Sequence, residues 1–379
     1  MNIAQIHQKF LRSTGADTDT RKIRKNSIFF ALKGENFNGN KFAAEAIAKG
    51  ASIAIVDEKE HALNKEQYIL VKDVLQTLQK VAQFHRKYLG LPILAITGSN
   101  GKTTTKELVQ SVLSRKFKTV STTGNLNNHI GVPLTLLSMD QDTEFGIVEM
   151  GANHSLEIEF LCSIAMPDYG YITNFGKAHL EGFGDLQGVI KAKTELYKHL
   201  EENKRLLFLN FDDEIQKKHN KYNHHFSFGS GRMAQVQVEY IENTNHAQIR
   251  YNNTIFKTNL IGTYNAVNIA AALCIGLYFK VDFNLIRDAI ENYDSKNNRS
   301  QLLELRSNTI LLDAYNANPT SMHAAIDNFN KLKTSKQKIV ILGDMFELGA
   351  AAETEHQIII NLIENSNFDQ AYLLRENFR

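Results

Sequence analysis

The stretch ILAITGSNGKTTTKE, residues 93 to 107, joins an apolar run, a glycine-containing turn and the start of a helix. This order is typical of a loop that holds phosphate groups. The glycines let backbone N–H groups face the anion, and the helix N-terminus adds partial positive charge. In such loops the lysine, here Lys102, contacts the outer phosphates, and the hydroxyl of the next residue, Thr103, binds Mg2+. We therefore expect a nucleoside triphosphate as the ligand.

The spacing of this loop is a variant of the usual phosphate loop. It is Gly98-x-x-Gly101-Lys-Thr, and Ile96 stands where the usual six-residue form has its first glycine. The alternative is an ordinary strand, turn and helix with a surface lysine. The loop residues expected to contact the nucleotide are Gly98, Ser99, Asn100, Gly101, Lys102, Thr103 and Thr104.

Composition indicates a folded globular protein of two to three domains. The chain has 379 residues, of which 43% are hydrophobic and 22% charged, with only 4 prolines. A net charge of +2 is too small to indicate a nucleic-acid partner. The two cysteines lie in apolar surroundings without metal or disulfide spacing, which favours a reducing compartment. With no apolar run of membrane length and no signal-peptide core, we expect a soluble cytoplasmic protein without membrane insertion.

Residues 1–90 alternate between strand and helix patterns, which predicts a small α/β layer. We expect strands at 28–32 and 51–56 and helices at 41–49 and 75–88. A polar glycine loop, residues 33–40, follows the first strand, and ligands often bind at such ends of strands in α/β sheets. Gly90 and Pro92 then mark a domain boundary.

Residues 91–300 hold a carboxylate and an imidazole at the ends of two predicted strands. Glu149 ends the first, and His179 follows the second, which covers 169–174. Strand ends beside a phosphate loop are suitable places for groups that hold Mg2+ or its water. Each residue also has an ordinary explanation, because a glutamate at a strand end can cap a helix and a single histidine is often structural.

Further along, we expect strands at 206–210, 235–241 and 247–257. Asn265 and Asn268 open an apolar helix with i,i+3 spacing, so that both amides lie on one helix face. N-capping would explain one of them but not both.

Several motifs together resemble the Mur ligases, the ATP-dependent amide-forming enzymes of bacterial peptidoglycan synthesis. They occur in the family's order and span nearly the whole chain: residues 97–103, Glu149-Met150-Gly151, His179-Leu180-Glu181, 191–195, Gly262-x-x-Asn265-x-x-Asn268 and 313–319. Residues 313–322 and 341–349 resemble the branch of the family that adds D-alanyl-D-alanine to UDP-N-acetylmuramoyl-tripeptide, and these two molecules are the implied substrates.

The resemblance implies an α/β fold with the three-domain Mur ligase architecture. A UDP-substrate domain would occupy 1–90, a central P-loop parallel-sheet ATPase domain 91–300, and a Rossmann-like ligase domain 301–379. The cofactors would be ATP and Mg2+. We expect a monomer.

The resemblance also implies roles for individual residues. Lys102 would hold ATP phosphates, Thr103, Glu149 and His179 would hold Mg2+, and Asn265 and Asn268 would contact the nucleotide base region. Arg299 and Asp313 would meet ATP when the C-terminal domain closes. Lys193 matches the lysine that CO2 carbamylates, which turns a cation into an oxygen ligand for metal. A solvated helix lysine is the alternative for Lys193.

In the first domain, one set of residues corresponds to the family's uridine-binding positions: Thr20, Arg21, Lys33, Gly34, Asn36, Asn38 and Gly39. The chain departs from the family here, because Asn38-Gly39-Asn40 replaces the usual Asp-Gly-His.

Residue types also favour ligation. A carboxylate is a poor electrophile, so amide synthesis first transfers a phosphoryl group to it, and this step needs charge neutralisation more than a nucleophilic side chain. No Gly-x-Ser-x-Gly elbow or cysteine–histidine pattern is found, which argues against a hydrolase. Two other classes remain open, namely a P-loop switch that hydrolyses ATP and a nucleotide-binding protein without catalysis. A folylpolyglutamate-type ligase is less compatible, because it lacks the N-terminal domain.

The C-terminal region predicts a strand after Asp313, then helices at 320–332 and 353–364 and strands at 338–342 and 370–374. A sheet of this size would be incomplete, and the family's Lys-Gly-Ser segment is absent. We therefore expect a truncated C-terminal domain, with impaired dipeptide binding and domain closure.

Overall fold

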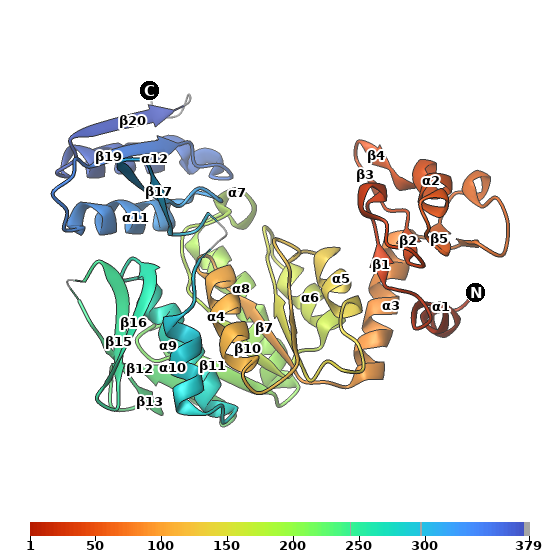
Figure 1. Cartoon of the computed structure of the whole chain (residues 1–379), viewed down its shortest axis with the longest axis horizontal. Coiled ribbons are helices and arrows are strands. Elements are labelled where there is room, and N and C mark those ends of the chain that lie inside the picture. The colour runs from red at the N-terminus through yellow and green to blue at the C-terminus, as the bar shows by residue number, and fades with distance from the viewer. Residues whose placement is uncertain (243, 296–297, 375–379) are drawn as a thin grey trace. The chain divides into compact units, whose positions relative to one another are not determined.

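The computed structural model describes residues 1–242, 244–295 and 298–374, and the chain divides into two compact units. The first unit comprises residues 1–93, 118–150 and 160–166, and the second comprises 94–117, 151–159 and 167–379. Figure 1 shows the elements in chain order by colour. The predicted boundaries near residues 90 and 300 stay predictions.

A four-stranded parallel sheet organises the N-terminal part of the first unit. Its order is β1-β2-β5-β6, and Phe29 pairs in register with Ala54. Ala43 and Ala46 on α2 belong to the same buried apolar cluster as these strands. The elements are α1 (Ile3–Phe10), β1 (Ala16–Asp17), η1 (Thr20–Lys22), β2 (Ile28–Phe30), α2 (Ala43–Ala48), β5 (Ile53–Val56), η3 (Lys59–His61) and β6 (Tyr68–Leu70).

The predicted glycine loop, residues 33–40, is a short antiparallel hairpin. Its strands are β3 (Lys33–Gly34) and β4 (Phe37–Asn38), followed by the 3-10 turn η2 (Gly39–Phe42). The predicted helix 41–49 therefore starts later than expected, at Ala43. A Cβ on Gly39 would lie 2.4 Å from the carbonyl oxygen of Leu32, so the turn needs a residue without a side chain.

The predicted helix 75–88 is confirmed as α3 (Val74–Leu89). Asp73 caps its start by accepting from the N–H of Gln76, and Gly90 ends it in the left-handed conformation. Helices α1 and α5 pack on α3. The other elements of this unit are β8 (Thr119–Ser121), α5 (Gly131–Leu137) and β9 (Phe145–Glu149), with α6 (Glu157–Ala165) shared between the units.

The second unit contains a run of five parallel strands in the order β13-β12-β11-β10-β7. Ile96 on β7 is the register partner of Tyr171 on β10, which in turn pairs with Phe208 on β11. All five residues of β7 are buried, as expected for a strand inside a covered parallel sheet. The strands are β7 (Ile93–Thr97), β10 (Tyr169–Ile172), β11 (Leu206–Asn210), β12 (His225–Gly229) and β13 (Val236–Gln237).

Helices pack on this sheet and on one another. Helix α8 contacts β10 and β11, and α9 contacts β12 and packs against α4. The helical elements are α4 (Lys102–Leu113), α7 (Leu180–Phe183), α8 (Leu186–Glu202), η4 (Gln216–His219), α9 (Asn265–Tyr278) and α10 (Phe283–Glu291).

Two predicted strands in this unit were wrong. Residues 247–257 contain a turn at Asn252 and Asn253, both left-handed, which joins β15 (His246–Tyr251) to β16 (Thr254–Ile261). Asparagine tolerates this backbone better than most residues. Residues 235–241 contain two short strands that belong to different sheets, β13 and β14 (Glu239–Tyr240).

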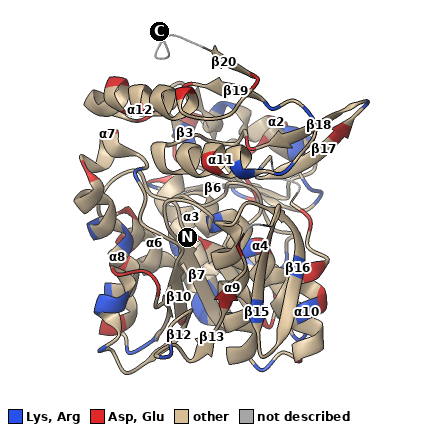
Figure 2. Cartoon of the chain, turned by 90° about the vertical axis from the view of Figure 1, so that its left-hand side faces the viewer, with Lys and Arg blue, Asp and Glu red and all other residues tan. Residues whose placement is uncertain are grey.

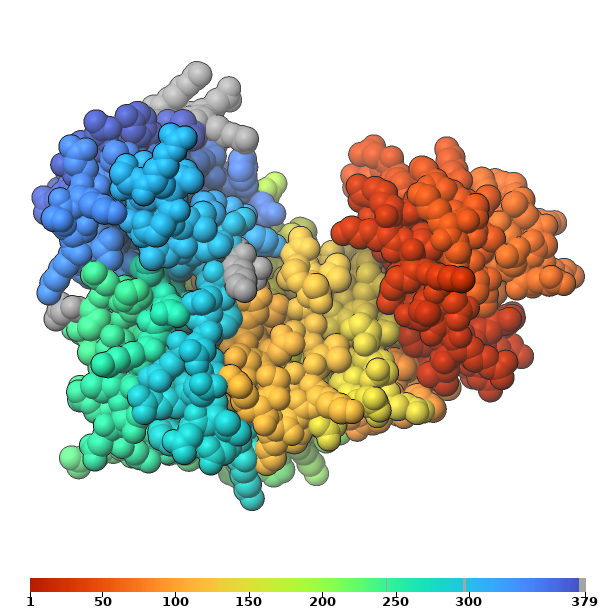
Figure 3. Space-filling model, viewed as in Figure 1, coloured from red at the N-terminus to blue at the C-terminus, as the bar shows by residue number. Residues whose placement is uncertain are grey.

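At the C-terminal end, the predicted helices and the last two strands are confirmed, but the strand expected after Asp313 lies before it. Leu312 ends a hairpin that the sequence did not reveal, formed by β17 (Gln301–Leu305) and β18 (Asn308–Leu312). The next elements are α11 (Pro319–Lys331), β19 (Ile339–Gly343), η5 (Gly349–Ala351), α12 (Ala352–Glu364) and β20 (Gln370–Leu374). The hairpin exposes Leu302 and Leu305, and this region can be followed in blue shades in Figure 3.

Charged segments of both signs are interspersed in Figure 2, in keeping with the small net charge. Among the described residues, no helix has the length and apolar character needed to cross a bilayer.

Candidate functional site

The phosphate-loop stretch connects β7 to the N-terminus of α4, as predicted. Gly98 has φ 141° and Gly101, directly before the helix, has φ 77°. A Cβ on Gly98 would lie 1.9 Å from the hydroxyl oxygen of Thr173, and one on Gly101 would lie 2.8 Å from the amide oxygen of Asn268. Both positions therefore need glycine for space as well as for backbone conformation.

Hydrogen bonds from neighbouring segments hold this loop in shape. The N–H of Ser99 donates to the carbonyl oxygen of Asn174 at 3.1 Å, and the N–H of Asn100 donates to the Asn174 side chain at 3.0 Å. The Asn100 amide also exchanges hydrogen bonds with the amide of Asn318, at 2.7 and 3.3 Å. Thr103 and Thr104 are buried in the first turn of α4.

The Nζ of Lys102 lies over the loop. It donates to the carbonyl oxygens of Gly98 and Ser99 at 2.8 and 3.1 Å. An ammonium group at this place, next to the N-terminus of a 12-residue helix, is suited to an anion with several oxygens.

His179 and Lys193 belong to the same unit as the loop. Burial lowers the pKa of His179; Glu347 opposes that shift, whereas Lys102 and Lys193 reinforce it. The Nδ1 of His179 is hydrogen-bonded to a carboxylate oxygen of Glu347. One ring nitrogen of His179 is thus engaged in a hydrogen bond. The backbone of His179 is left-handed, with φ 54°.

Lys193 is 1% exposed on α8. Its Nζ donates to the carbonyl oxygen of Ala152 at 3.4 Å and lies 5.4 Å from the ring centroid of Phe183. Burial, followed by the charge of Lys102, lowers its pKa to about 7. The alternative of a solvated helix lysine is therefore wrong, because this lysine is enclosed by protein.

Glu149 ends β9 in the first unit and is 1% exposed. Its Oε1 accepts from the amide of Asn127 at 2.8 Å, and its N–H donates to the hydroxyl of Thr122. Among the described residues, Oε2 has no hydrogen-bond partner. A buried carboxylate oxygen without a partner suits a cation ligand, so the residue fits the Mg2+ role that the sequence suggested.

Asn265 and Asn268 lie on one face of α9, as expected, but neither caps the helix. Tyr264 is the N-cap residue and makes no side-chain cap. The Asn268 amide donates to Asn265 at 2.9 Å and accepts from the hydroxyl of Thr105 at 3.1 Å. Through Thr105 and Gly101, Asn268 is part of the wall of the phosphate loop.

Arg299 and Asp313 lie near each other in the second unit. The Arg299 guanidinium stacks over the Tyr315 ring at 4.0 Å from its centroid. Desolvation raises the pKa of Asp313, and Arg299 opposes the shift. Burial, and then the charge of Asp313, raises the pKa of Tyr264, whose hydroxyl is hydrogen-bonded to Ser300 at 2.5 Å.

The residues expected to bind uridine lie in the first unit. Arg21, next to Thr20, forms an exposed ion pair with Asp19 at 2.7 Å. Lys33 forms ion pairs with Asp57 at 3.0 Å and with Glu58 at 3.6 Å. Asn36 and Gly34 are exposed at the hairpin.

Asn38 and Asn40, which stand where the family usually has Asp and His, bind carboxylates of the first unit in the structure. The Asn38 amide donates to both carboxylate oxygens of Glu58, at 3.1 and 3.0 Å, and its oxygen accepts from the N–H of Asn40. The Asn40 amide donates to Asp57 at 2.8 Å. The hairpin is therefore held by amide–carboxylate hydrogen bonds.

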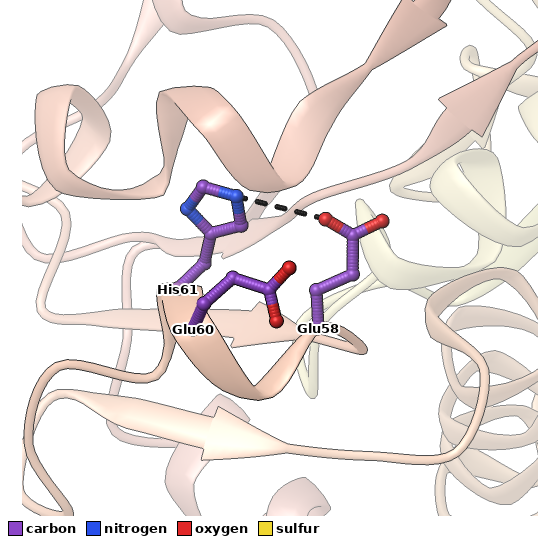
Figure 4. Close-up of side chains that lie close together, drawn as sticks. All are labelled: Glu58, Glu60 and His61. Atoms are coloured by element: carbon purple, nitrogen blue, oxygen red, sulfur yellow. Dashed lines mark ion pairs between the residues drawn. The ribbon is translucent and has the colours of Figure 1, made fainter.

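A further group of side chains near this hairpin was not foreseen. Glu58, Glu60 and His61 bring one ligand atom each within 4.8 Å of the others (Figure 4). The dashed line marks the His61–Glu58 pair at 3.6 Å. Because Glu58 already serves Asn38 and Lys33, we assign no metal to this group.

Sequence reasoning missed the residues that hold the predicted ones in place. Asn318 and Glu347 both stood inside motifs that the sequence had indicated, at 313–319 and 341–349, but nothing in their spacing showed which partner each would meet. Asn127 lies in a loop without a recognisable pattern, and Asn174 was placed at the end of the predicted strand 169–174, which in the structure ends at Ile172.

Comparison with known protein families gives three matches in chain order. They are the Mur ligase family catalytic domain at residues 13–86, the Mur ligase middle domain at 96–276, and the Mur ligase glutamate ligase domain at 298–379.

Curated proteins and solved structures agree with these matches. A UDP-N-acetylmuramoyl-tripeptide–D-alanyl-D-alanine ligase of Bacillus subtilis is 34% identical over 94% of this chain and 79% of its own length. The protein of that name from Escherichia coli is 33% identical over 89% of this chain and 76% of its own. A MurF structure from Acinetobacter baumannii has a TM-score of 0.84 at 29% identity and covers 98% of this chain and 86% of its own. MurF from Thermotoga maritima in complex with ADP has a TM-score of 0.83 at 27% identity, with coverage of 97% and 86%.

Proposed function

This chain belongs to the Mur ligase family, and we infer that it joins D-alanyl-D-alanine to UDP-N-acetylmuramoyl-tripeptide, converting ATP to ADP and phosphate. The observation that carries this inference is the agreement between the phosphate loop and the relatives, which share at least 29% identity over most of the chain and bear that name. The reaction is an ATP-dependent amide ligation in peptidoglycan synthesis.

The reaction proceeds in two steps that balance. A carboxylate oxygen of the tripeptide attacks the γ-phosphorus of ATP, and ADP leaves. The amine of the dipeptide then attacks the carbonyl carbon of the acyl phosphate, phosphate leaves, and the amine loses a proton. Both steps depend on positioning and on neutralisation of phosphate charge.

We assign phosphate binding to residues 98–104. The backbone N–H groups at the N-terminus of α4 face the anion, and Lys102 exchanges the carbonyls of Gly98 and Ser99 for phosphate oxygens. Asn265 and Asn268 support the loop from α9 and contact the nucleotide. Arg299 and Asp313 contact ATP from the C-terminal side.

Thr103, Glu149 and His179 are the residues we assign to Mg2+. Among the described residues, Oε2 of Glu149 has no hydrogen-bond partner, and Nε2 is the ring nitrogen of His179 that is not bonded to Glu347; both atoms suit this role. When bound, Mg2+ neutralises charge on the transferred phosphoryl group.

We propose that Lys193 is carbamylated. A neutral amine attacks CO2 and loses a proton, which leaves a carbamate on Nζ. A pKa of about 7 leaves much of the amine neutral near neutral pH, which favours this step. The carbamate then supplies oxygen ligands where the ammonium supplied none.

For the UDP end of the substrate we propose the hairpin residues Lys33, Gly34, Asn36, Asn38 and Gly39, together with Thr20 and Arg21. Lys33 has the charge suited to phosphate oxygens once it exchanges Asp57 for them. We further propose that the protein acts in the cytoplasm as a monomer.

Phosphate release in four mixtures tests the reaction. ATP is supplied with the UDP-linked tripeptide, with D-alanyl-D-alanine, with both, or with neither. The account predicts rapid release only with both. Equal release with and without the dipeptide would instead indicate an ATP-hydrolysing switch.

A further inference from the structure

The segment that follows β10 meets C-terminal elements at several points of the second unit. The N–H of Lys177 donates to the hydroxyl of Thr320 at 2.9 Å, and its Nζ pairs with the buried Glu355 at 2.6 Å. The N–H of Glu181 donates to the carbonyl oxygen of Glu347 at 3.0 Å. Helix α7, labelled in Figure 1, packs against η5.

One of these contacts involves a proposed metal ligand, because it joins His179 to Glu347. The Nδ1 of His179 is hydrogen-bonded to Oε2 of Glu347, and both side chains keep some exposure to solvent. Each of these two residues has a left-handed backbone, with φ of 54° and 61°. Non-glycine residues adopt this conformation only when their surroundings hold them there, and such positions cluster at functional sites.

The surroundings of the pair are well defined. The ring of Phe183 lies edge-on to the imidazole at 6.4 Å between centroids, and Lys193 lies over that same Phe183 ring. A Cβ on Gly349 would lie 3.4 Å from the Cα of Glu181, so the loop after β19 packs closely on α7. The imidazole is thus fixed from Glu347 on one side and Phe183 on another.

We propose that Glu347 is a positioning residue, whose carboxylate fixes the ring orientation and tautomer of His179 so that Nε2 is the metal-ligating nitrogen. A histidine that binds metal through one nitrogen commonly donates its other N–H to a carboxylate, and loss of that partner weakens metal binding or activity. Here the partner comes from the C-terminal segment 343–349. The imidazole is therefore correctly oriented only while this segment is in contact with α7.

The inference rests on the proposed function, since it takes His179 as a metal ligand. Glu347 is not itself a ligand in this account. Removal of the Glu347 carboxylate should lower the affinity for a divalent ion and the turnover number, while leaving the KM for the UDP-linked tripeptide unchanged.

The test uses the full chain with Glu347→Ala, Glu347→Gln and a matched control, Glu355→Gln. The control weakens another ion pair of the segment after β10, between Lys177 and Glu355 on α12, without touching His179. Binding of Mn2+ in the presence of ADP, measured by electron paramagnetic resonance without peptide substrates, is the readout that does not require activity. Far-UV circular dichroism and thermal unfolding show that each variant is folded.

We expect Glu347→Ala to weaken Mn2+ binding and to lower kcat by about 10- to 100-fold. Glu347→Gln should recover much of the loss, because its amide oxygen still accepts from Nδ1–H, and Glu355→Gln should change Mn2+ affinity far less. If Glu347→Ala fails to fold, Glu347→Leu, which has similar bulk but no acceptor for Nδ1–H, takes its place in the comparison with Glu355→Gln.

Two results would overturn the proposal. The first is that Glu347→Ala and Glu347→Gln bind Mn2+ as tightly as the unsubstituted chain. The second is that Glu355→Gln loses as much Mn2+ affinity as Glu347→Ala, which would show that the contact only holds the two segments together. A parent chain that forms no amide while Glu347→Ala still loses Mn2+ affinity would remove the proposed reaction and leave the positioning role intact.

Discussion

Two glycine-containing loops, one in each unit, were predicted to bind phosphorylated ligands, and they are built on different principles. In the loop 98–101 of the second unit, shape is set by the backbone. Gly98 and Gly101 have positive φ, and neighbouring side chains leave no room for a Cβ. In the hairpin 33–38 of the first unit, which is followed by a turn without room for a Cβ at Gly39, side chains hold the strands through hydrogen bonds from Asn38 and ion pairs from Lys33.

The difference explains why one loop is easy to recognise in sequence and the other varies. A backbone that only glycine can adopt restricts the sequence directly. A network of amides and carboxylates can be rebuilt with other polar residues, provided that donors and acceptors still match. Asn38-Gly39-Asn40 therefore replaces Asp-Gly-His while Glu58 and Asp57 stay satisfied.

The sharpest contrast is between the lysines of the two units. Lys193 is buried without a carboxylate at ion-pair distance among the described residues, whereas Lys33 is half-exposed and paired with Asp57. Lys193→Ala should abolish amide synthesis, and short carboxylic acids should restore part of it by replacing the carbamate. Lys33→Ala should retain turnover and raise the KM for the UDP-linked substrate. Full activity of Lys193→Ala in a product assay would refute the carbamate.

Lys102→Ala should lower kcat by about 100- to 1,000-fold, because a charge that faces the transferred phosphoryl group is lost. The free energy of unfolding should change by less than about 1 kcal/mol, since the lysine is only partly buried. Nucleotide affinity by calorimetry and unfolding by urea measure the two effects. Unchanged affinity and rate would remove the phosphate-loop assignment.

A matched pair of glycine substitutions tests the structural basis of the comparison. Gly98→Ala places a Cβ 1.9 Å from the Thr173 hydroxyl in a left-handed backbone, which should cost about 3 kcal/mol of stability. Gly34→Ala meets no atom within 4 Å and should change stability by less than about 0.5 kcal/mol. Equal urea midpoints for the two variants would show that the backbone does not set the shape of the phosphate loop.

Asn38→Asp would sharpen the description of the hairpin. The change places a carboxylate against Glu58 and removes the amide donor, so we expect a loss of about 1 kcal/mol at neutral pH. The loss should shrink in acid, where the carboxylates take up protons. Urea unfolding at neutral and acid pH measures it, and an equal loss at both would argue against charge repulsion.

The last prediction concerns acid and the first unit alone. His7 and His85 are buried and share a hydrogen bond of 2.9 Å between Nε2 and Nδ1. Burial, and then His85, lowers the pKa of His7 from 6.5 to about 4. Between these values the unfolded chain binds the proton and the folded chain does not.

Stability from His7 is therefore present above about pH 6.5 and is lost as the pH falls toward 4, by at most about 1.4 kcal/mol per pH unit. His7→Gln should flatten this decline in urea unfolding followed by circular dichroism. An unchanged pH dependence in the variant would show that His7 titrates normally.

The sequence predicted the elements whose cause is local. The apolar run 93–97, the cap Asp73 and the terminator Gly90 each act within a few residues, and the corresponding elements were found. Two elements were missed. The turn at Asn252 and Asn253 was missed because apolar alternation continues across it, and the hairpin before Asp313 was missed because it is formed by pairing between β17 and β18.

The same limit applies to the site. Site residues such as Lys102, Glu149 and His179 could be predicted from the sequence, but the residues that form hydrogen bonds with the site could not. Glu347 lies 168 positions from His179, and Asn318 lies 218 positions from Asn100. Such pairs are set by the fold, and nothing local in the sequence specifies them.

The central claim is that this phosphate loop drives amide synthesis through an acyl phosphate. It is tested most directly by supplying ATP, D-alanyl-D-alanine and UDP-linked tripeptide whose reacting carboxylate carries 18O, and by analysing the released phosphate by mass spectrometry. The account predicts one 18O atom in the phosphate for each amide formed, because the carboxylate oxygen that attacks the γ-phosphorus leaves with it. Phosphate without the label would contradict the account, since its oxygen would then have come from water.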